Sequence, residues 1–147
     1  MRRLALAPLV GLLFSGCILM RPMPIPPEPW TTPTGLVVVD LLKPEGRAVG
    51  AGDVVSVHYE LSLEDGAVVD SSRDRGEPAE FTLGMGQVVP GLDEAVTGMV
   101  EGAIRRATLT PELGYGAAGI PGAIPPDSSI TFLIELMNVT PAGAETP

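Results

Sequence analysis

The chain has 147 residues, 45% of them hydrophobic, and its 9 basic and 18 acidic residues give a formal charge of −9. This length suits one compact domain with appendages, and so acidic a domain is expected to be repelled by phosphate backbones, which argues against nucleic acid as a partner. A single cysteine and a single histidine exclude an intramolecular disulfide framework and any multi-cysteine or polyhistidine metal site.

The first sixteen residues have the composition of a signal peptide. Arg2 and Arg3 give a positive start, residues 4–14 are an apolar stretch of eleven residues, and Ser15 and Gly16 supply small side chains before a cleavage point. Eleven residues are too few for a membrane span, which needs roughly 20. We therefore expect residues 1–16 to be removed.

The stretch Phe14-Ser15-Gly16-Cys17 resembles the lipobox of bacterial lipoproteins, although Phe14 stands where leucine is usual. The resemblance implies that Cys17 becomes the acylated first residue and that a lipid anchor holds the protein in the bacterial cell envelope. An ordinary secretory signal followed by an incidental cysteine is the alternative. Ile18 and Leu19 lack the aspartate that retains lipoproteins at the inner membrane in enteric-type sorting, so we expect the outer membrane, on its periplasmic side.

Residues 17–34 are predicted to be a linker that follows the lipidated cysteine. Six prolines lie between residues 21 and 34, and proline disfavours the interiors of helices and sheets, so this stretch should be extended, polyproline-like chain. Trp30 lies within it and has two candidate locations, the lipid interface or an apolar patch of the domain. Residues 141–147 are expected to be a disordered tail.

Residues 35–140 form one predicted domain, which opens with a strand at residues 36–39. Its clearest element is Val54–Leu63, where apolar and polar residues alternate with the period of a half-buried strand. His58 lies on the polar face of this strand, so we expect a solvent-facing histidine rather than a catalytic one. Glu64-Asp65-Gly66 predicts a hairpin turn.

The remaining elements are short. We expect strands at residues 67–71, 81–83, 104–109 and 130–139, a helix at residues 92–100, and a long loop rich in glycine and proline at residues 111–126. Together these elements predict an α+β fold in which an antiparallel sheet curls around one short helix.

The sequence lacks the residues that most catalytic mechanisms require. The one histidine disfavours a Ser/His pair, no nucleophile elbow is present, and the glycine-rich residues 114–119 lack the Lys-Ser/Thr that completes a phosphate cradle. What remains is an apolar cavity with a few polar groups, which from composition alone could equally be an ordinary core.

A series of motifs across the domain resembles the FKBP-type peptidyl-prolyl cis-trans isomerases, a family that also binds macrolide immunosuppressants. In chain order the motifs are Val57-His58-Tyr59, Asp65-Gly66, Asp70-Ser71-Ser72-Arg73-Asp74-Arg75, Phe81-Thr82-Leu83-Gly84, Val88-Val89-Pro90-Gly91-Leu92, Pro111-Glu112-Leu113-Gly114-Tyr115-Gly116, Ile124-Pro125-Pro126 and Phe132. The resemblance implies a half-barrel of five to six strands around one short helix, with prolyl rings entering an apolar pocket between them.

The resemblance also implies the site residues. Those expected to be catalytic are Tyr59, Asp70 and Tyr115. Those expected to bind substrate are Val69, Arg75, Phe81, Val88, Val89, Leu92, Ile124 and Phe132. Four positions depart from the best-studied members: Val69 and Leu92 replace phenylalanine and tryptophan, and Ala79 and Ile120 replace an aromatic residue and a histidine. We expect these smaller side chains to loosen the pocket and weaken the binding of large macrolides.

The expected function is rotation of X-Pro bonds in envelope proteins, aided by desolvation and distortion of the amide in the pocket, with no cofactor and no metal. The family implies that the Tyr115 hydroxyl and the Val89 backbone N–H hold the substrate chain. Asp70 is either an acceptor aimed into the pocket or part of an ion pair with Arg75 that shapes the loop. The alternative function is a catalytically weak lipoprotein binding module or chaperone that uses the same pocket. Expected partners are proline-containing polypeptides and, through the anchor, the membrane; we expect a monomer.

Overall fold

The computed structural model describes residues 27–144, and its strands form one curved antiparallel sheet. The predicted signal peptide, Cys17 and the end of the predicted tail lie outside the described residues. The elements in chain order are β1 (Trp30–Thr31), β2 (Val37–Leu42), β3 (Val54–Leu63), β4 (Val68–Ser71), β5 (Ala79–Thr82), α1 (Pro90–Val96), β6 (Ile104–Leu109), a 3₁₀ turn (Pro111–Leu113) and β7 (Ile130–Thr140).

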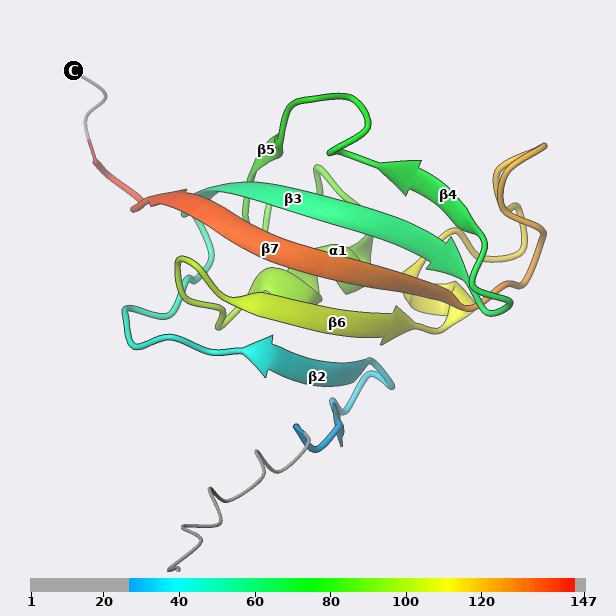
Figure 1. The fold of residues 1–147 in the computed structure, drawn as a ribbon, viewed down its shortest axis with the longest axis horizontal. Coiled ribbons are helices and arrows are strands. Elements are labelled where there is room, and N and C mark those ends of the chain that lie inside the picture. The colour runs from blue at the N-terminus through cyan, green and yellow to red at the C-terminus, as the bar shows by residue number, and fades with distance from the viewer. Residues whose placement is uncertain (1–26, 145–147) are drawn as a thin grey trace, which may run out of the picture.

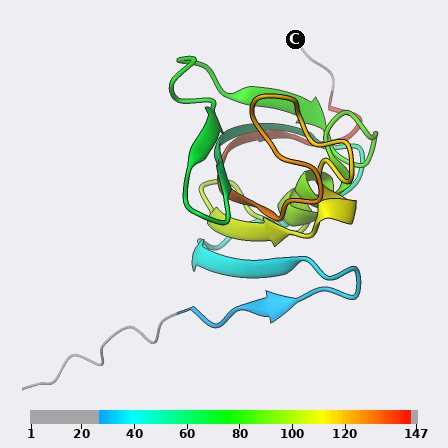
Figure 2. The same cartoon turned by 90° about the vertical axis from the view of Figure 1, so that its right-hand side faces the viewer.

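The sheet has the order β1-β2-β6-β7-β3-β4, and β5 pairs with the first half of β3. It curves around α1 without closing into a barrel, so that one face encloses the helix and the other is open (Figures 1 and 2). The predicted α+β fold, an antiparallel half-barrel around one short helix, is confirmed. The sheet has seven strands where five to six were predicted, and the additional strand is β1, which has two residues.

The core lies between α1 and the enclosed face of the sheet. The alternation of β3 places Val55, Val57 and Leu61 in this core, against Phe132 and Ile134 of the central strand β7. Burial of these apolar side chains is the main stabilising contribution. Polar residues alternate with them on the open face, as the period of two predicts.

The helix begins two residues earlier and ends four residues earlier than predicted. Pro90 starts it, because proline lacks the N–H that has no partner in a first turn and its φ suits a helix. It ends at Val96 because Gly98 takes a positive φ of 84° and donates its N–H to the Val49 carbonyl. Gly91 allows close packing, since a Cβ there would lie 2.4 Å from Leu109 Cδ2.

The predicted linker, residues 17–34, needs a correction at its end. Trp30 and Thr31 pair with Val38 and Val37 as an added edge strand, and the Thr32 N–H donates to the Leu36 carbonyl in the turn between them. Trp30 packs on the domain, where the Arg105 guanidinium lies 5.8 Å from the centre of its ring. Sequence reasoning missed β1 because proline dominates the composition on both sides of these two residues.

Candidate functional site

A hollow of about 320 Å³ lies between α1 and the enclosed face of β3, β4, β5 and β7. This volume is at the lower end of the range of about 300–1,000 Å³ typical of ligand pockets. The hollow is lined by Tyr59, Leu61, Asp70, Ala79, Phe81, Gln87, Val88, Val89, Leu92, Tyr115 and Phe132. Most of the lining is apolar, and its polar groups stand on β3, on β4 and in the loops.

The walls of the hollow are made by side chains that the strands and the helix direct inward. The rings of Tyr59 and Phe132 meet edge to face with centres 5.7 Å apart. Phe81 of β5 and Leu92 of α1 complete the apolar wall and are almost fully buried. The result is a cavity with few competing hydrogen-bonding groups.

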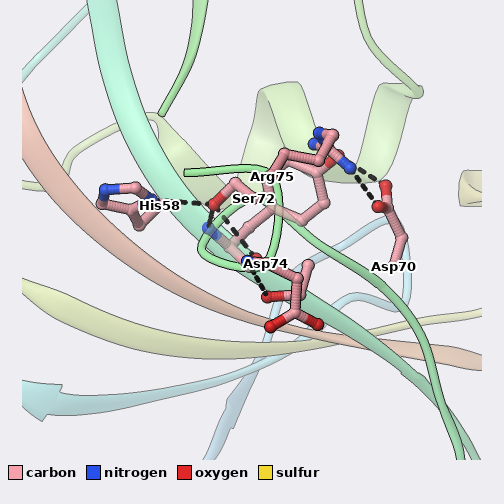
Figure 3. A network of polar contacts seen from close by, with 7 residues as sticks. His58, Asp70, Ser72, Asp74 and Arg75 are labelled. Atoms are coloured by element: carbon pink, nitrogen blue, oxygen red, sulfur yellow. Dashed lines mark hydrogen bonds and ion pairs between the residues drawn. The ribbon is translucent and has the colours of Figure 1, made fainter. Parts of the chain in front are cut away.

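A polar network stands at the mouth of the hollow, where β3 and β4 lie side by side. The Tyr59 hydroxyl donates to Asp70 Oδ2 at 2.6 Å, and Arg75 donates to Asp70 Oδ1 and, at 2.8 Å, to the Tyr59 hydroxyl oxygen. The guanidinium also lies over the Tyr59 ring, 5.5 Å from its centre. Asp70 thus forms the ion pair with Arg75 that was one of its two expected roles, and it also accepts from Tyr59. Figure 3 shows how Arg75 reaches Asp70.

Opposing effects set the pKa of each group in this network. Burial acts to raise the pKa of Asp70, but the hydrogen bonds from Tyr59 and Arg75 outweigh it and hold that pKa below its usual value. Burial, followed by the hydrogen bond to Asp70, raises the pKa of Tyr59. At neutral pH Asp70 is therefore a carboxylate and Tyr59 a neutral phenol.

Ser72 fastens the loop after β4 to the backbone of β3. Its buried hydroxyl accepts the Tyr59 N–H at 2.8 Å, and His58 Nδ1 lies 2.9 Å from the same oxygen (Figure 3). His58 lies on the open face of the sheet, away from the hollow, as its place in the alternation predicts. It is half-buried rather than fully exposed because Ser72 and Glu135 flank it.

Two hydrogen-bond donors at the hollow remain free. Within residues 27–144, neither the Tyr115 hydroxyl nor the Val89 backbone N–H donates to a protein acceptor. Burial, and then the negative charge of Asp70, raises the pKa of Tyr115, so its phenol keeps its proton at neutral pH. Both donors are available to a bound peptide.

Three residues expected to bind substrate do not line the hollow. Val69 packs beside the core on the neighbouring position of β4, and Arg75 stands outside the hollow in the polar network. Ile124 is buried and instead lines a separate hollow with the loop around Pro121. The register of β4 against β3 shifts here: Leu61 pairs with Asp70 and Ser62 with Val68, so that Val69 has no partner on β3 and the simple alternation of faces does not apply to it.

Two lining residues were missed by sequence reasoning. Leu61 follows Tyr59 by two positions and therefore shares its face, a signal that the alternation already contained. Gln87 had no such signal: its side-chain carbonyl accepts the Thr82 N–H at 2.9 Å, which bends the loop back onto β5. Ala79, expected to shape the mouth of the site, does line the hollow, whereas Ile120 does not.

Across residues 27–144, no group of three or more histidine, cysteine, aspartate or glutamate side chains is placed to hold a metal ion. In the same part of the chain, no helix has the length and apolar character that crossing a membrane requires.

Known proteins are similar to this chain in sequence and in fold. Residues 45–137 match the family described as FKBP-type peptidyl-prolyl cis-trans isomerase. FK506-binding protein 2 of Yarrowia lipolytica is 50% identical over 88 residues, which cover 60% of this chain and 61% of that protein. An FK506-binding protein of Neisseria meningitidis serogroup B is 45% identical over 105 residues, covering 71% and 96%.

A solved structure agrees with these sequence matches. FkpA from Escherichia coli superposes with a TM-score of 0.71 at 39% identity, over 78% of this chain and 52% of that one. This chain belongs to the family of FKBP-type peptidyl-prolyl cis-trans isomerases, enzymes that accelerate rotation about the peptide bond that precedes proline.

Proposed function

We propose that the hollow binds a prolyl residue of a protein substrate and twists the preceding amide by removing it from water. The observation that carries this proposal is an apolar cavity of about 320 Å³ with two free donors, the Tyr115 hydroxyl and the Val89 N–H, at its edge. A peptide carbonyl on each side of the twisted bond matches these donors. No nucleophile or proton shuttle is required.

The physical argument concerns charge separation in the amide. Resonance makes the planar X-Pro amide polar and opposes its rotation with a barrier of about 20 kcal/mol. Water stabilises the planar form more than the twisted one, in which conjugation is lost. Transfer into a dry cavity walled by Phe81, Leu92 and Phe132 therefore destabilises the planar form relative to the transition state.

Asp70 acts in this proposal as a positioning residue. Its carboxylate accepts bonds from both Tyr59 and Arg75, which fixes the tilt of the Tyr59 ring that forms one wall. Its negative charge also disfavours ionisation of Tyr115, so the hydroxyl there remains a donor. The two roles considered for Asp70, facing the pocket and pairing with arginine, are thus compatible.

The test is a protease-free isomerisation assay by exchange NMR, on a peptide with leucine before proline. We expect catalysis well above the uncatalysed rate, and equal values of kcat/KM in H₂O and D₂O, since no proton moves in the transition state. A rate at background would refute the catalytic proposal. A substantial solvent isotope effect would refute the desolvation mechanism alone.

We further propose that Cys17 carries a lipid anchor that holds the enzyme, as a monomer, at the periplasmic face of a bacterial outer membrane. The support is the lipobox-like stretch 14–17 and the absence of aspartate after Cys17; its substrates would then be envelope proteins. Labelling with a radioactive fatty acid should mark the wild type and leave Cys17→Ser unlabelled, and the label should sediment with outer-membrane fractions. Equal labelling of Cys17→Ser would reject Cys17 as the acylated residue.

A second candidate function is a catalytically weak binding module or chaperone. The small side chain of Ala79, which lines the hollow together with Leu92, favours it because fewer contacts hold the prolyl ring. Peptide binding with a rate at background would select this function. We also expect weak binding of large macrolides, for the same reason.

A further inference from the structure

The sheet edge formed by β1 and β2 is unusually apolar. Nine large apolar side chains are exposed among residues 27–144, and four of them, Trp30, Val37, Leu41 and Leu42, lie on this edge. We call these four residues the apolar edge. Soluble monomers seldom expose such groups together unless the surface has a partner.

The geometry makes this edge apolar on both of its faces. Trp30 pairs with the buried Val38 and so projects toward the helix side, whereas Leu42 lies opposite Ile104 and projects from the open face. β1 covers only the first two residues of β2. Sheet edges are normally protected by charged residues, and here only Lys43 follows the exposed pair Leu41-Leu42.

The charge of this region differs from that of the whole chain. Eighteen acidic residues make the chain strongly negative, but between residues 29 and 43 the only acidic residue is Asp40, which pairs with Arg105 at 2.5 Å. Bacterial membranes carry anionic lipids, which repel a negative surface. The apolar edge is therefore a part of the domain that approaches a bilayer with less of that penalty, although the Glu94 carboxylate accepts a hydrogen bond from Thr34 in the turn between β1 and β2.

The position of the edge along the chain favours the same partner. Cys17 precedes Trp30 by thirteen residues, a span of at most about 40 Å in polyproline-like chain. β1 is the first element within residues 27–144, so an anchor at Cys17 tethers this edge to the bilayer through a shorter length of chain than any later element. Tethering raises the local concentration of lipid so far that a weak contact suffices.

We propose that the apolar edge rests in the headgroup region of the bilayer that holds the Cys17 anchor, so that the catalytic hollow opens away from the membrane. Tryptophan and leucine suit this interface. No residue of β1, β2 or β6 lines the hollow, and β4 and β5 lie on the opposite side of the domain from β1 and β2 (Figures 1 and 2). The inference rests on the proposed lipid anchor.

The only tryptophan of the chain provides the probe. The acylated full-length mature protein is placed on vesicles of phosphatidylethanolamine and phosphatidylcholine, with or without bromine near the headgroup end of the acyl chains. We expect brominated lipid to quench Trp30 emission at least twofold. Leu41→Ser/Leu42→Ser should lose most of this quenching, whereas Val68→Ser/Met85→Ser, which changes two exposed apolar residues outside β1 and β2, should keep it.

Flotation of the same samples separates the two proposals. Protein that floats with the vesicles but shows no quenching of Trp30 overturns the apolar edge as a membrane contact while the anchor stands. Protein that does not float overturns both. A dimer that forms without vesicles and shifts Trp30 emission with protein concentration assigns the edge to a second copy of the chain, and overturns the proposal as well.

Discussion

Two arginine–aspartate pairs in this domain are built alike but stand in different surroundings. Arg105 pairs with Asp40 and lies over the ring of Trp30; Arg75 pairs with Asp70 and lies over the ring of Tyr59. The Arg105 and Asp40 side chains are 6% and 23% exposed, whereas the Arg75 and Asp70 side chains are 47% and 38% exposed. Because burial determines what a charge costs, the first pair should maintain the fold and the second should serve the site.

The buried pair also completes the helix. Arg105 Nη1 donates to the Ala95 carbonyl at 2.9 Å and to the Thr97 carbonyl at 3.3 Å, so one side chain satisfies acceptors at the end of α1 that the helix itself leaves free. Its positive charge also suits the negative end of the helix dipole. Arg75 of the exposed pair bonds no helix carbonyl, since it donates to Asp70 and to the Tyr59 hydroxyl.

The largest expected effect is therefore that of Arg105→Met. The change leaves Asp40 and two helix carbonyls without their partner, and should lower the free energy of unfolding by about 3 kcal/mol, measured by urea denaturation. Arg106→Met, at the exposed neighbouring position of β6, is the control and should change it by less than about 0.5 kcal/mol. Equal effects of the two changes would show that the buried pair has no special role in stability.

Asp70→Ala should have the opposite effect, a loss of activity with little loss of stability. Loss of the carboxylate releases Tyr59 and should reduce kcat/KM about tenfold, equivalent to about 1.4 kcal/mol. The free energy of unfolding should change by less than about 1 kcal/mol, because exposed ion pairs contribute little. Asp74→Ala, in the same loop, is the control for activity. An intact kcat/KM in the Asp70 variant would remove Asp70 from the site.

The aromatic ring under each guanidinium should contribute less to stability than the ion pair does. Trp30→Leu removes the ring over Arg105 and should lower the free energy of unfolding by about 0.5–1 kcal/mol, the range for a partly exposed cation–π contact. kcat/KM on a soluble peptide should stay at the wild-type value, since no residue of β1 lines the hollow. A marked loss of catalysis in this variant would mean that the two pairs are coupled.

The smallest expected effect is that of pH. The pKa of Asp70 lies below its usual value, so the stabilisation it provides is present above the unfolded-state pKa of about 3.9 and is lost as the pH falls through the folded-state value. The pKa values of Tyr59 and Tyr115 are raised, so both phenols persist until the pH rises past about 10. We expect kcat/KM to be constant between about pH 5 and pH 9, and a step within that range would contradict the assigned protonation states.

The sequence predicts the regular strands well and the irregular segments poorly. Val54–Leu63 and Ile104–Leu109 have the predicted bounds, because a strand with one buried face must alternate. The helix was misplaced because its end depends on Gly98 reaching the Val49 carbonyl, a contact made far along the chain. β1 escaped prediction because only its pairing with β2 makes two residues a strand.

In the site, most of the residues that the motifs indicated line the hollow. Tyr59, Phe81 and Phe132 do so from strands, and Val88 and Tyr115 do so from loops. Arg75 and Ile124 stand in loops whose course no local pattern determines, and neither lines it. Gln87 lines the hollow because its side-chain carbonyl accepts a hydrogen bond from the Thr82 N–H. That bond depends on how two loop ends meet.

The hydroxyl of Tyr115 offers the most direct test of how the hollow works, because Tyr115→Phe removes one oxygen and leaves the ring in place. We predict that kcat/KM for a Leu-Pro peptide, measured by exchange NMR, falls about tenfold with the loss of one hydrogen bond to the twisted amide, while the urea midpoint stays unchanged. A kcat/KM equal to that of the wild type would contradict the proposed role of this donor in catalysis.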